Sequence, residues 1–393
     1  MNLRFFSFLS RFSLPREGRG GVVVILVLLA IGCVRDPDLH LHRDNHVEFD
    51  VPDVQIDLDV MWEYDLDYDW HAEWSYGWDY EDEQAMGPLG YSEPKAYNLR
   101  RYYLGGWPDQ PHTTEQQYVV GEKTFRTRYN YGFYDVLVYN HLDDDVVQSI
   151  VFDESTLDSV MVYTNASMMA SRYQAPVYDR SFNQPDELFS AYERNIHITD
   201  DLADYDHYDP VNRTYYKKMK MQLLPVTYIY LTQVRLHHNN GKVTNAVGDA
   251  NLTGMARGVT LNSGIANKDV VSVYYNVRFK KDCVIKQTGE KVDIAGGRCL
   301  TFGIANQNSS RVAKASDVKD RVKHYMDVNL MFYNGMDTTM VFDVTDQIRR
   351  RYRGGVITID LDMDTIPVPL RPGGSGFDAV VKEFDEENFY LEI

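Results

Sequence analysis

The segment of residues 54–80 constrains the fold more than any other part of the chain. Every even-numbered residue in it is apolar or aromatic, and most odd-numbered ones are acidic. A side-chain period of two is typical of a strand in an antiparallel sheet, with one face buried and the other in water. Most strands have ~3–10 residues, so this segment is too long for one strand. We therefore expect two strands joined by a turn near residues 64–68.

The rest of the chain adds many short strands with turn signals between them. Tyr and Thr are frequent, and both favour strands. Asn334-Gly335 predicts a tight hairpin of type I′, because both central positions of that turn need a positive φ. Strands are predicted at residues 131–140, 146–152, 159–163, 219–236, 258–261, 270–279, 298–304, 325–333, 338–343 and 356–361.

Helical signals are few. Pro185 and Asp186 lie near the start of residues 181–192, and apolar residues follow at helical spacing, so a short helix is expected there. Residues 343–352 predict a helical turn, and Pro225 predicts an edge strand or a bulge. Many short strands with almost no long helix predict an all-β fold of two Greek-key β-sandwich domains.

Domain boundaries are predicted from composition. Residues 1–32 have the layout of a signal peptide, and residues 33–50 are polar and unpatterned, as expected of a tether. The remaining length fits two domains of ~100–200 residues each. A polar, Asp-rich stretch without apolar period precedes residue 210. The predicted domains are therefore residues 51–208 and residues 209–393.

The N-terminal region predicts export and lipidation. Four Arg precede an apolar run that ends at Ala30-Ile31-Gly32-Cys33. This order of basic, apolar and small residues is that of a secretory signal. The run is about half the ~20 residues that a spanning helix needs. The ending resembles a bacterial lipobox, although Ala30 stands where Leu is usual, so acylation of Cys33 is expected.

Charge limits the partners. Residues 1–32 contain four Arg and one Glu, so removing them changes the formal net charge from −18 to −21. A chain this acidic does not favour nucleic acid or bare anionic membrane. Membrane attachment is therefore expected from the lipid on Cys33, and several acyl chains hold more firmly than one.

Cys283 and Cys299 are separated by a predicted turn. An exported protein can keep a disulfide, so one interpretation is a bond between them. The other interpretation is two unpaired core cysteines on neighbouring strands. Their spacing matches no metal motif.

All five tryptophans lie in one part of the chain, between residues 62 and 107. One interpretation is a platform on which sugar rings stack, as in a carbohydrate-binding module. The alternative is core packing. We favour it because most of the tryptophans lie at even-numbered positions, which are the buried positions of the predicted strands. The residues concerned are Trp62, Trp70, Trp74, Trp78 and Trp107.

No catalytic motif is recognised, so the chain is predicted not to be an enzyme and to need no cofactor. The G-x-S-x-G, H-E-x-x-H and P-loop patterns are absent from the sequence. His40, His42 and His46 lie among aspartates, but a tether offers no fixed geometry for a metal ion, so no metal site is predicted.

Several phrases occur in a recognisable order. They are the lipobox cysteine, GFYDVLVYN at 132–140, LTGMARG at 252–258, LTFG at 300–303, FDVTDQI at 342–348 and PGGSGFD at 372–378. In this order the chain resembles the Bacteroidales lipoproteins related to fimbrium anchor subunits, the major and minor fimbrial anchor family. The long acidic Trp/Tyr segment is not part of that pattern.

The resemblance implies two transthyretin-like β-sandwich domains and a lipid-anchored place in the outer membrane. It also implies a non-enzymatic role at the base of a fimbrium, where subunits join by strand addition. In that mode main-chain hydrogen bonds supply affinity. Residues 384–393 are one candidate strand, although a frayed tail or the last strand of the chain's own sheet is the simpler interpretation. A surface glycan-binding lipoprotein is the alternative function.

Overall fold

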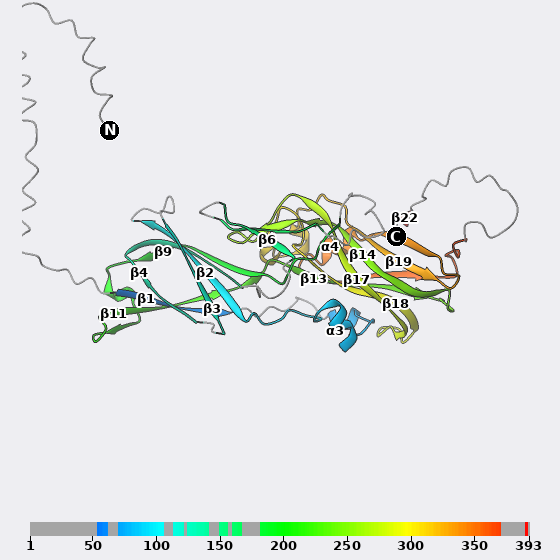
Figure 1. Cartoon of the computed structure of the whole chain (residues 1–393), viewed down its shortest axis with the longest axis horizontal. Coiled ribbons are helices and arrows are strands. Elements are labelled where there is room, and N and C mark those ends of the chain that lie inside the picture. Colours follow the sequence, from blue (N-terminus) through cyan, green and yellow to red (C-terminus); the bar gives the residue numbers. More distant parts are fainter. Residues whose placement is uncertain are drawn as a thin grey trace, which may run out of the picture. The chain divides into compact units, whose positions relative to one another are not determined.

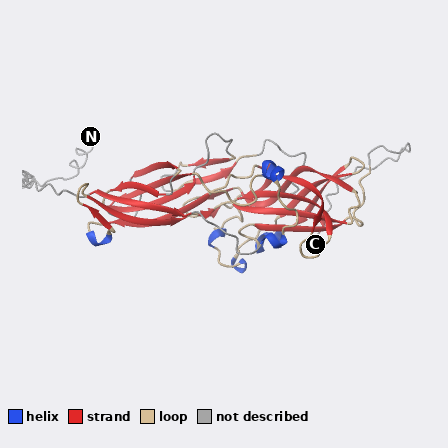
Figure 2. Cartoon of the chain, turned by 90° about the horizontal axis from the view of Figure 1, so that it is seen from below, coloured by secondary structure: helices blue, strands red, loops and turns tan. Residues whose placement is uncertain are grey.

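Strands arranged in layered sheets make up most of the described chain, and the helices between them are short (Figure 1; Figure 2). The computed structural model describes residues 53–61, 70–105, 113–121, 124–140, 149–155, 159–166, 181–370 and 390–391. The all-β fold class predicted from the sequence is confirmed. The labels used below are those of Figure 1.

Two sheets share the first hydrophobic core. Sheet A has the strand order β10 (His207–Asp209), β11 (Thr214–Gln222), β1 (Asp53–Met61) and β4 (Thr124–Tyr129). Sheet B has the order β12 (Leu224–Pro225), β9 (Phe189–Ile198), β5 (Gly132–Asn140), β2 (Ala96–Gly105) and β3 (Thr113–Val120). Val60 and Met221 of sheet A pack in one cluster with Leu99 and Val138 of sheet B. These two layers form a β-sandwich.

A small third sheet covers the other face of sheet B. Sheet C has the order β16 (Ile265–Ala266), β15 (Gly258–Thr260), β7 (Met161–Thr164) and β6 (Ile150–Asp153). Leu137 and Tyr139 of β5 pack in one cluster with Val162 and Val259 of sheet C. Strand β5 is therefore buried on both faces, which explains why residues 134–140 are all buried.

The largest sheet, sheet D, contains the strands of the second half of the chain. Its order is β21 (Gly355–Asp362), β13 (Tyr228–His237), β18 (Lys291–Thr301), β17 (Val270–Val284), β14 (Val243–Ala256), β19 (Tyr325–Phe332), β20 (Asp337–Asp343) and β22 (Tyr390–Leu391). The short strand β8 (Ser181–Phe182) also pairs with β17.

Strand β17 turns sheet D into two layers. Its first half pairs with β14 and its second half pairs with β18, so one long strand belongs to both layers. Tyr230 and Val234 of β13 pack in one core cluster with Leu252 of β14 and Val328 of β19. The long bent strand thus makes the corner of a second sandwich.

The helices are short and lie between strands. They are α2 (Trp70–Glu73), α3 (Tyr80–Met86) and α4 (Thr345–Arg350), with 3₁₀ turns η3 (Leu202–Asp204), η4 (Ser309–Arg311) and η5 (Ala315–Asp317). The predicted helical turn at residues 343–352 corresponds to α4. Asp79 caps α3, since its side chain accepts a hydrogen bond from the backbone N–H of Asp82 and the Asp82 carboxylate accepts one from the backbone N–H of Asp79.

The second strand predicted within residues 54–80 is wrong. The first strand is present as β1, which pairs with β11 and β4. From Trp70 onward the chain forms α2, an irregular stretch and α3 instead. The alternation in that stretch reflects burial without strand pairing, because Trp74 and Tyr76 both point into an apolar cluster against sheet D.

The helix predicted at residues 181–192 is also wrong. This segment contains β8, a connection and the start of β9. Leu188 and Phe189 are both fully buried, but in two different hydrophobic clusters. Only an extended backbone sends consecutive side chains in opposite directions. Asn140 holds this extended form, because its amide bonds the backbone of Glu187 and Phe189.

The predicted hairpin at Asn334-Gly335 is present between β19 and β20, but its turn is not of type I′. Among these residues only Gly335 has a positive φ. The backbone N–H of Phe332 donates to the Met336 carbonyl at 2.7 Å, so the loop is longer than two residues. A longer loop needs only one left-handed position, which glycine fills.

Pro225 lies in β12 at the edge of sheet B, as predicted for a residue without a backbone N–H. The predicted domain boundary at residues 208–209 falls within β10 of sheet A. Further along the chain, β12 is the last strand of sheet B, and the next strand, β13, belongs to sheet D. A division into two domains at residues 208–209 stays a prediction.

Candidate functional site

Part of the predicted site lies outside the described residues. This holds for Cys33, Trp62 and Trp107, and also for the histidines of the tether. Within the part of the chain that the structure describes, no helix has the length and apolar character needed to cross a membrane.

The remaining three tryptophans lie together, but they cover a sheet. Trp74 is 3% exposed, and Trp70 and Trp78 pack around the same cluster on β13, β18 and β21. The Trp74 and Trp78 rings are 6.3 Å apart and tilted by 50°. The indole N–H of Trp74 donates to the Gly77 carbonyl at 3.1 Å. This arrangement favours core packing over a flat sugar-stacking surface for these three residues.

A buried carboxylate fixes this segment to the sheet. Asp82 of α3 is fully buried and accepts hydrogen bonds from the Tyr76 hydroxyl at 3.0 Å and the Arg278 guanidinium at 3.1 Å. Lys280 forms an ion pair with the same carboxylate. Burial and the neighbouring Asp82 charge raise the pKa of Tyr76. No local pattern predicts this network, because Arg278 and Lys280 lie about 200 residues away from Asp82 along the chain.

Cys283 and Cys299 are both free. Cys283 of β17 lies opposite Val292 of β18, and Cys299 lies seven positions further along β18. At ~3.3 Å per residue this is a separation of ~23 Å, whereas a disulfide needs Cα atoms within ~7 Å. Of the two interpretations, unpaired cysteines on neighbouring strands agrees with the structure. Burial raises the pKa of the Cys283 thiol to about 11 and also raises the pKa of Cys299.

The two edges of sheet D differ. At β21, Gln347 of α4 bonds both the backbone N–H and the carbonyl of Thr358 at 2.9 Å, so a side chain occupies this edge. At β20, a segment from the end of the chain adds a strand. Tyr390 and Leu391 of β22 pair in parallel with Val341 and Phe342. The β20 edge therefore accepts an added strand.

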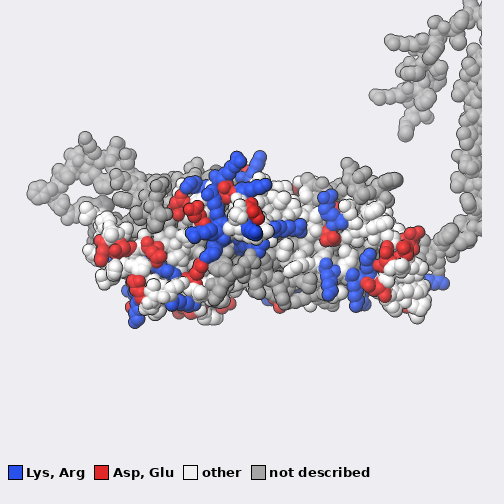
Figure 3. Space-filling view, turned by 180° about the vertical axis from the view of Figure 1, so that it is seen from behind, with Lys and Arg blue, Asp and Glu red and all other residues white. Residues whose placement is uncertain are grey.

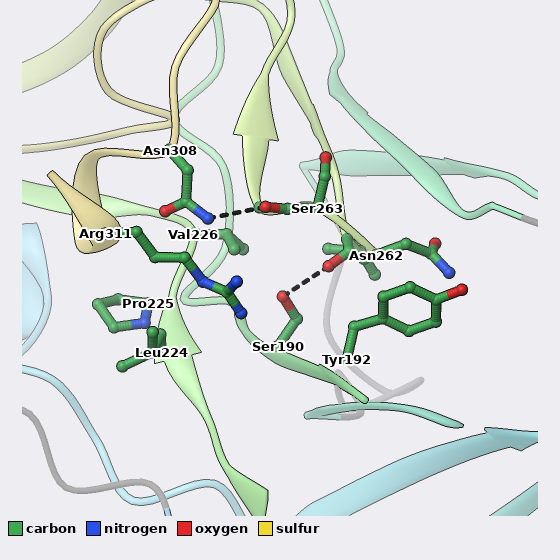
Figure 4. Close-up of a pocket in the computed structure, with 11 residues that line it drawn as sticks. Ser190, Tyr192, Leu224, Pro225, Val226, Asn262, Ser263, Asn308 and Arg311 are labelled. Carbon is green, nitrogen blue, oxygen red and sulfur yellow. Dashed lines mark hydrogen bonds between the residues drawn. The ribbon is translucent and has the colours of Figure 1, made fainter. Parts of the chain in front are cut away.

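A small open pocket lies where sheets B and C meet the loop around η4 (Figure 4). Its cavity volume is about 10 Å³, which is room for one water molecule. The residues that line it are Ser190, Tyr192, Leu224, Pro225, Val226, Leu261, Asn262, Ser263, Gly264, Asn308 and Arg311. The sequence did not indicate this pocket, because its lining comes from four separate segments.

Two hydrogen bonds shape the pocket. The Ser190 hydroxyl donates to the Leu261 carbonyl at 3.0 Å, and the Asn308 amide donates to the Ser263 carbonyl at 2.7 Å. The side-chain oxygen of Asn308 is buried and has no hydrogen-bond partner among the described residues. In Figure 4 the Arg311 guanidinium reaches into the space between Ser190 and Pro225.

One buried histidine has acidic and basic neighbours. The His324 imidazole lies 2.8 Å from the Asp320 carboxylate, which also accepts a hydrogen bond from Arg349 at 3.1 Å. The His324 and Asp320 side chains are 0% and 1% exposed. Neither lines the pocket described above, so this group connects the loop to α4 and has no access to a substrate there.

A second buried polar group crosses sheet D. Asp327 of β19 accepts hydrogen bonds from the backbone and side-chain amides of Asn251, at 3.1 and 3.0 Å. The Ser181 hydroxyl donates to Asn251 in turn. Burial raises the pKa of Asp327 to about 7. On an exposed turn, His238, Asp362 and Asp364 lie close enough to share a cation, but they also bond one another.

The fold and the surface features together define a layered all-β protein with an occupied strand edge and a small polar pocket. No family model matches the chain. A search of curated proteins also finds no match.

Among solved structures, the chain is similar to a candidate adhesin from Bacteroides ovatus, with 14% identity, a TM-score of 0.47 and coverage of 84% of this chain and 97% of that one. A candidate adhesin from Bacteroides thetaiotaomicron has 12% identity, a TM-score of 0.42 and coverage of 80% and 93%. The fimbrial anchor protein Mfa2 from Porphyromonas gingivalis has 10% identity, a TM-score of 0.41 and coverage of 78% and 90%. Two of these structures are thus of candidate adhesins, and the third is of a fimbrial anchor protein.

Proposed function

We propose that this chain is a lipid-anchored component of the bacterial outer membrane that holds or assembles a fimbrium without catalysing a reaction. Its partners are fimbrial subunits, which it contacts by strand addition. The β20 edge is the observation that carries this proposal, because it already accepts the short strand Tyr390–Leu391.

The physical basis is the hydrogen-bonding capacity of an open edge. An edge strand presents a row of N–H and carbonyl groups that pair readily with another extended segment. In this sheet the opposite edge is occupied by Gln347 at Thr358. Partner strands are therefore directed to β20, where, among the described residues, Tyr390 and Leu391 pair at two positions.

Peptide competition tests the strand-accepting edge. A labelled peptide of residues 384–393 is titrated onto a chain that ends at residue 383 and onto the full chain. We expect tight binding to the shortened chain and weaker binding to the full chain, since β22 occupies the same edge. A peptide with Pro in place of Tyr390 is the control, because Pro removes a ladder hydrogen bond. Equal binding to both chains would rule out β20 as the acceptor.

The role in the cell is tested separately by gene deletion. We expect a deletion strain to make fimbriae of altered length that are released from the cell. Fimbriae of normal length and normal retention in that strain would contradict the proposal.

The alternative, a surface glycan-binding lipoprotein that uses the tryptophans, has less support at Trp70, Trp74 and Trp78 because they pack on sheet D. Glycan contact by Trp62 and Trp107 stays a prediction. Quenching of tryptophan fluorescence by iodide measures the exposure of the whole set. Tight binding to neutral glycan arrays, abolished by Ala at Trp62 or Trp107, would favour this alternative.

A further inference from the structure

A histidine and two aspartates converge at the end of the β13–β21 strand pair. His238 directly follows β13, Asp362 is the last residue of β21, and Asp364 lies in the turn after it. One imidazole nitrogen and one oxygen of each carboxylate all lie within 4.8 Å of one another. The His238 Nδ1 atom is 3.0 Å from an Asp362 oxygen and 3.9 Å from an Asp364 oxygen. We call these three residues the His238 cluster.

The turn that carries the two aspartates is held by other groups. Met363, between them, is fully buried in the core of sheet D, and its backbone N–H donates to the His237 carbonyl at 2.9 Å. The Lys242 ammonium donates to the carbonyls of Met363 and Ile366, at 2.6 and 2.8 Å. These contacts use none of the three side chains of the His238 cluster. The fold therefore places the potential ligands in advance, which lowers the entropic cost of filling a site.

The charge around the cluster is negative. The His237 imidazole, on the neighbouring residue, lies 2.8 Å from the Glu290 carboxylate and 3.0 Å from that of Asp360. Two further carboxylates thus lie beside the two of the cluster, against Arg235, which pairs with Asp360 at 3.7 Å, and Lys242 on the turn. Figure 3 shows that Asp and Glu gather in patches apart from the main group of Lys and Arg. Because salt screens charges beyond ~8 Å, a cation responds mainly to such local groups.

Neither aspartate of the cluster has a Lys or Arg partner among the described residues. The ion pairs that Asp362 and Asp364 form there are with His238 alone. The three side chains are 59%, 50% and 70% exposed for His238, Asp362 and Asp364, so an ion in solution can reach them. The other possible occupant of the His238 Nδ1 atom is a proton, which would pair with the same carboxylates.

The donor set indicates which cation fits. Imidazole nitrogen together with carboxylate oxygen suits Zn²⁺, whereas Ca²⁺ and Mg²⁺ prefer oxygen ligands alone. Zinc binds such ligands at ~2.0–2.2 Å in a tetrahedral arrangement, so two of its ligand atoms lie ~3.3–3.6 Å apart. The distances of 3.0 and 3.9 Å from the His238 nitrogen lie on either side of this range. Small rotations of the three side chains would therefore be enough to complete the geometry.

We propose that His238, Asp362 and Asp364 bind one Zn²⁺ ion, with water in the remaining coordination position. Binding replaces the hydrogen bond between His238 and Asp362 by two bonds to the metal. The ion then ties the end of β13 to the turn after β21, and its water-filled position stays open to solvent. This site goes beyond the proposed function, which requires no metal ion.

Calorimetric titration of the full chain with zinc chloride tests the site. The H40Q/H42Q/H46Q variant serves as the background, because the tether histidines could bind zinc independently. We expect saturable binding of one Zn²⁺ to the cluster and a higher midpoint of thermal unfolding with zinc, since the ion binds the folded state. In this background, His238→Gln and Asp364→Asn should each bind at least tenfold more weakly and lose the thermal shift.

A matched control separates the cluster from general binding to surface histidines. His197 is exposed and stacks on Phe133, so His197→Gln should bind zinc like the background chain. X-ray absorption at the zinc edge should show one imidazole nitrogen, with oxygen as the other ligands. Without metal, His238→Gln and Asp364→Asn should unfold within a few degrees of the background chain, because both side chains are exposed.

Three results would overturn the zinc site. They are the absence of saturable zinc binding, equal affinity in the His238→Gln variant, and an absorption spectrum without an imidazole ligand. Any of these would leave His238 as an ion-pair partner of the aspartates. Equally tight binding of calcium chloride would also overturn the proposal, because it would assign the cation to the carboxylates alone.

Discussion

The carboxyl group of Asp327 is buried in the middle of sheet D, and no cation among the described residues pairs with it. Its partner is the neutral Asn251, so burial dominates and raises the pKa of Asp327 from 3.8 to about 7. A raised pKa in the folded state means that folding favours the protonated form. The contribution of this group to stability is therefore complete below pH ~4 and is lost as the pH rises through about 7.

The Asp327→Asn variant removes that dependence, because Asn keeps a carbonyl oxygen for Asn251 but does not ionise. We expect the free energy of unfolding of the unchanged chain to fall by up to ~4 kcal/mol between pH 4 and 8 relative to the variant. Urea unfolding at several pH values measures the difference. The raised pKa values of His237 and His238 act in both proteins and cancel in the comparison. Parallel pH profiles would contradict this account of Asp327.

The free cysteines give a second prediction at the residue scale. Because burial raises the pKa of Cys283 to about 11 and Cys299 is fully buried, both thiols should react slowly in the folded chain. Thiol titration at pH 8 should give two free thiols from the mature chain in denaturant and fewer than one at early times without it. Finding no free thiol in denaturant would show that the bond between Cys283 and Cys299 exists.

The pattern of residues predicts the secondary structure correctly at some positions. It fails at others where contacts distant in sequence decide the backbone conformation. The strand predicted at residues 131–140 is present as β5, and Pro225 lies in an edge strand as predicted. A helix at residues 181–192 would place Leu188 and Phe189 on one apolar face. The fold instead buries them in two separate hydrophobic clusters. Their extended backbone depends on Asn140, which is distant in sequence, so no local pattern reports it.

At the scale of elements, α3 is held mainly by Asp82. This carboxylate completes the capping box and meets Arg278 and Lys280 in a buried position. Asp82→Asn should lower the free energy of unfolding by about 3 kcal/mol, because two cations lose their partner at a buried site. Glu81→Gln should cost less than ~1 kcal/mol, since Glu81 is an exposed partner of Arg278. Chemical denaturation of both variants measures the two effects, and equal losses would contradict the assigned role.

The segment of residues 70–91 shows where element prediction stops. Its alternation correctly marked Trp74 and Tyr76 as buried, but it did not identify what they are buried against. The outer face of β13 and β18 needs a cover, and this segment supplies it without pairing as a strand. Period two thus predicted burial more reliably than it predicted hydrogen bonding.

Sheet pairing and the pocket were beyond sequence reasoning for the same physical reason. The pocket collects Ser190, Leu224, Asn262 and Arg311 from distant segments, and only the completed fold brings them together. The run of Arg349, Arg350 and Arg351 does stand out in the sequence. Such a run is ordinary for a solvated helix face, so on its own it does not indicate a site.

At the scale of the whole molecule, charge and lipid have separate roles. The acidic chain repels an anionic membrane, so attachment depends on the predicted acyl group at Cys33. The β20 edge is the position at which Tyr390 and Leu391 add a strand to sheet D. In the proposed function, membrane attachment and subunit contact therefore belong to different parts of the chain.

The most direct test of the central claim is the distribution of fimbriae between cells and medium when Cys33 is replaced by Ala. Immunoblots of both fractions measure the chain and the fimbrial shaft together. We predict that the Cys33→Ala chain appears in the medium and that shaft subunits are released with it, while the unchanged chain retains both on the cell. Full retention of the shaft on cells that make only the Cys33→Ala chain would contradict the account.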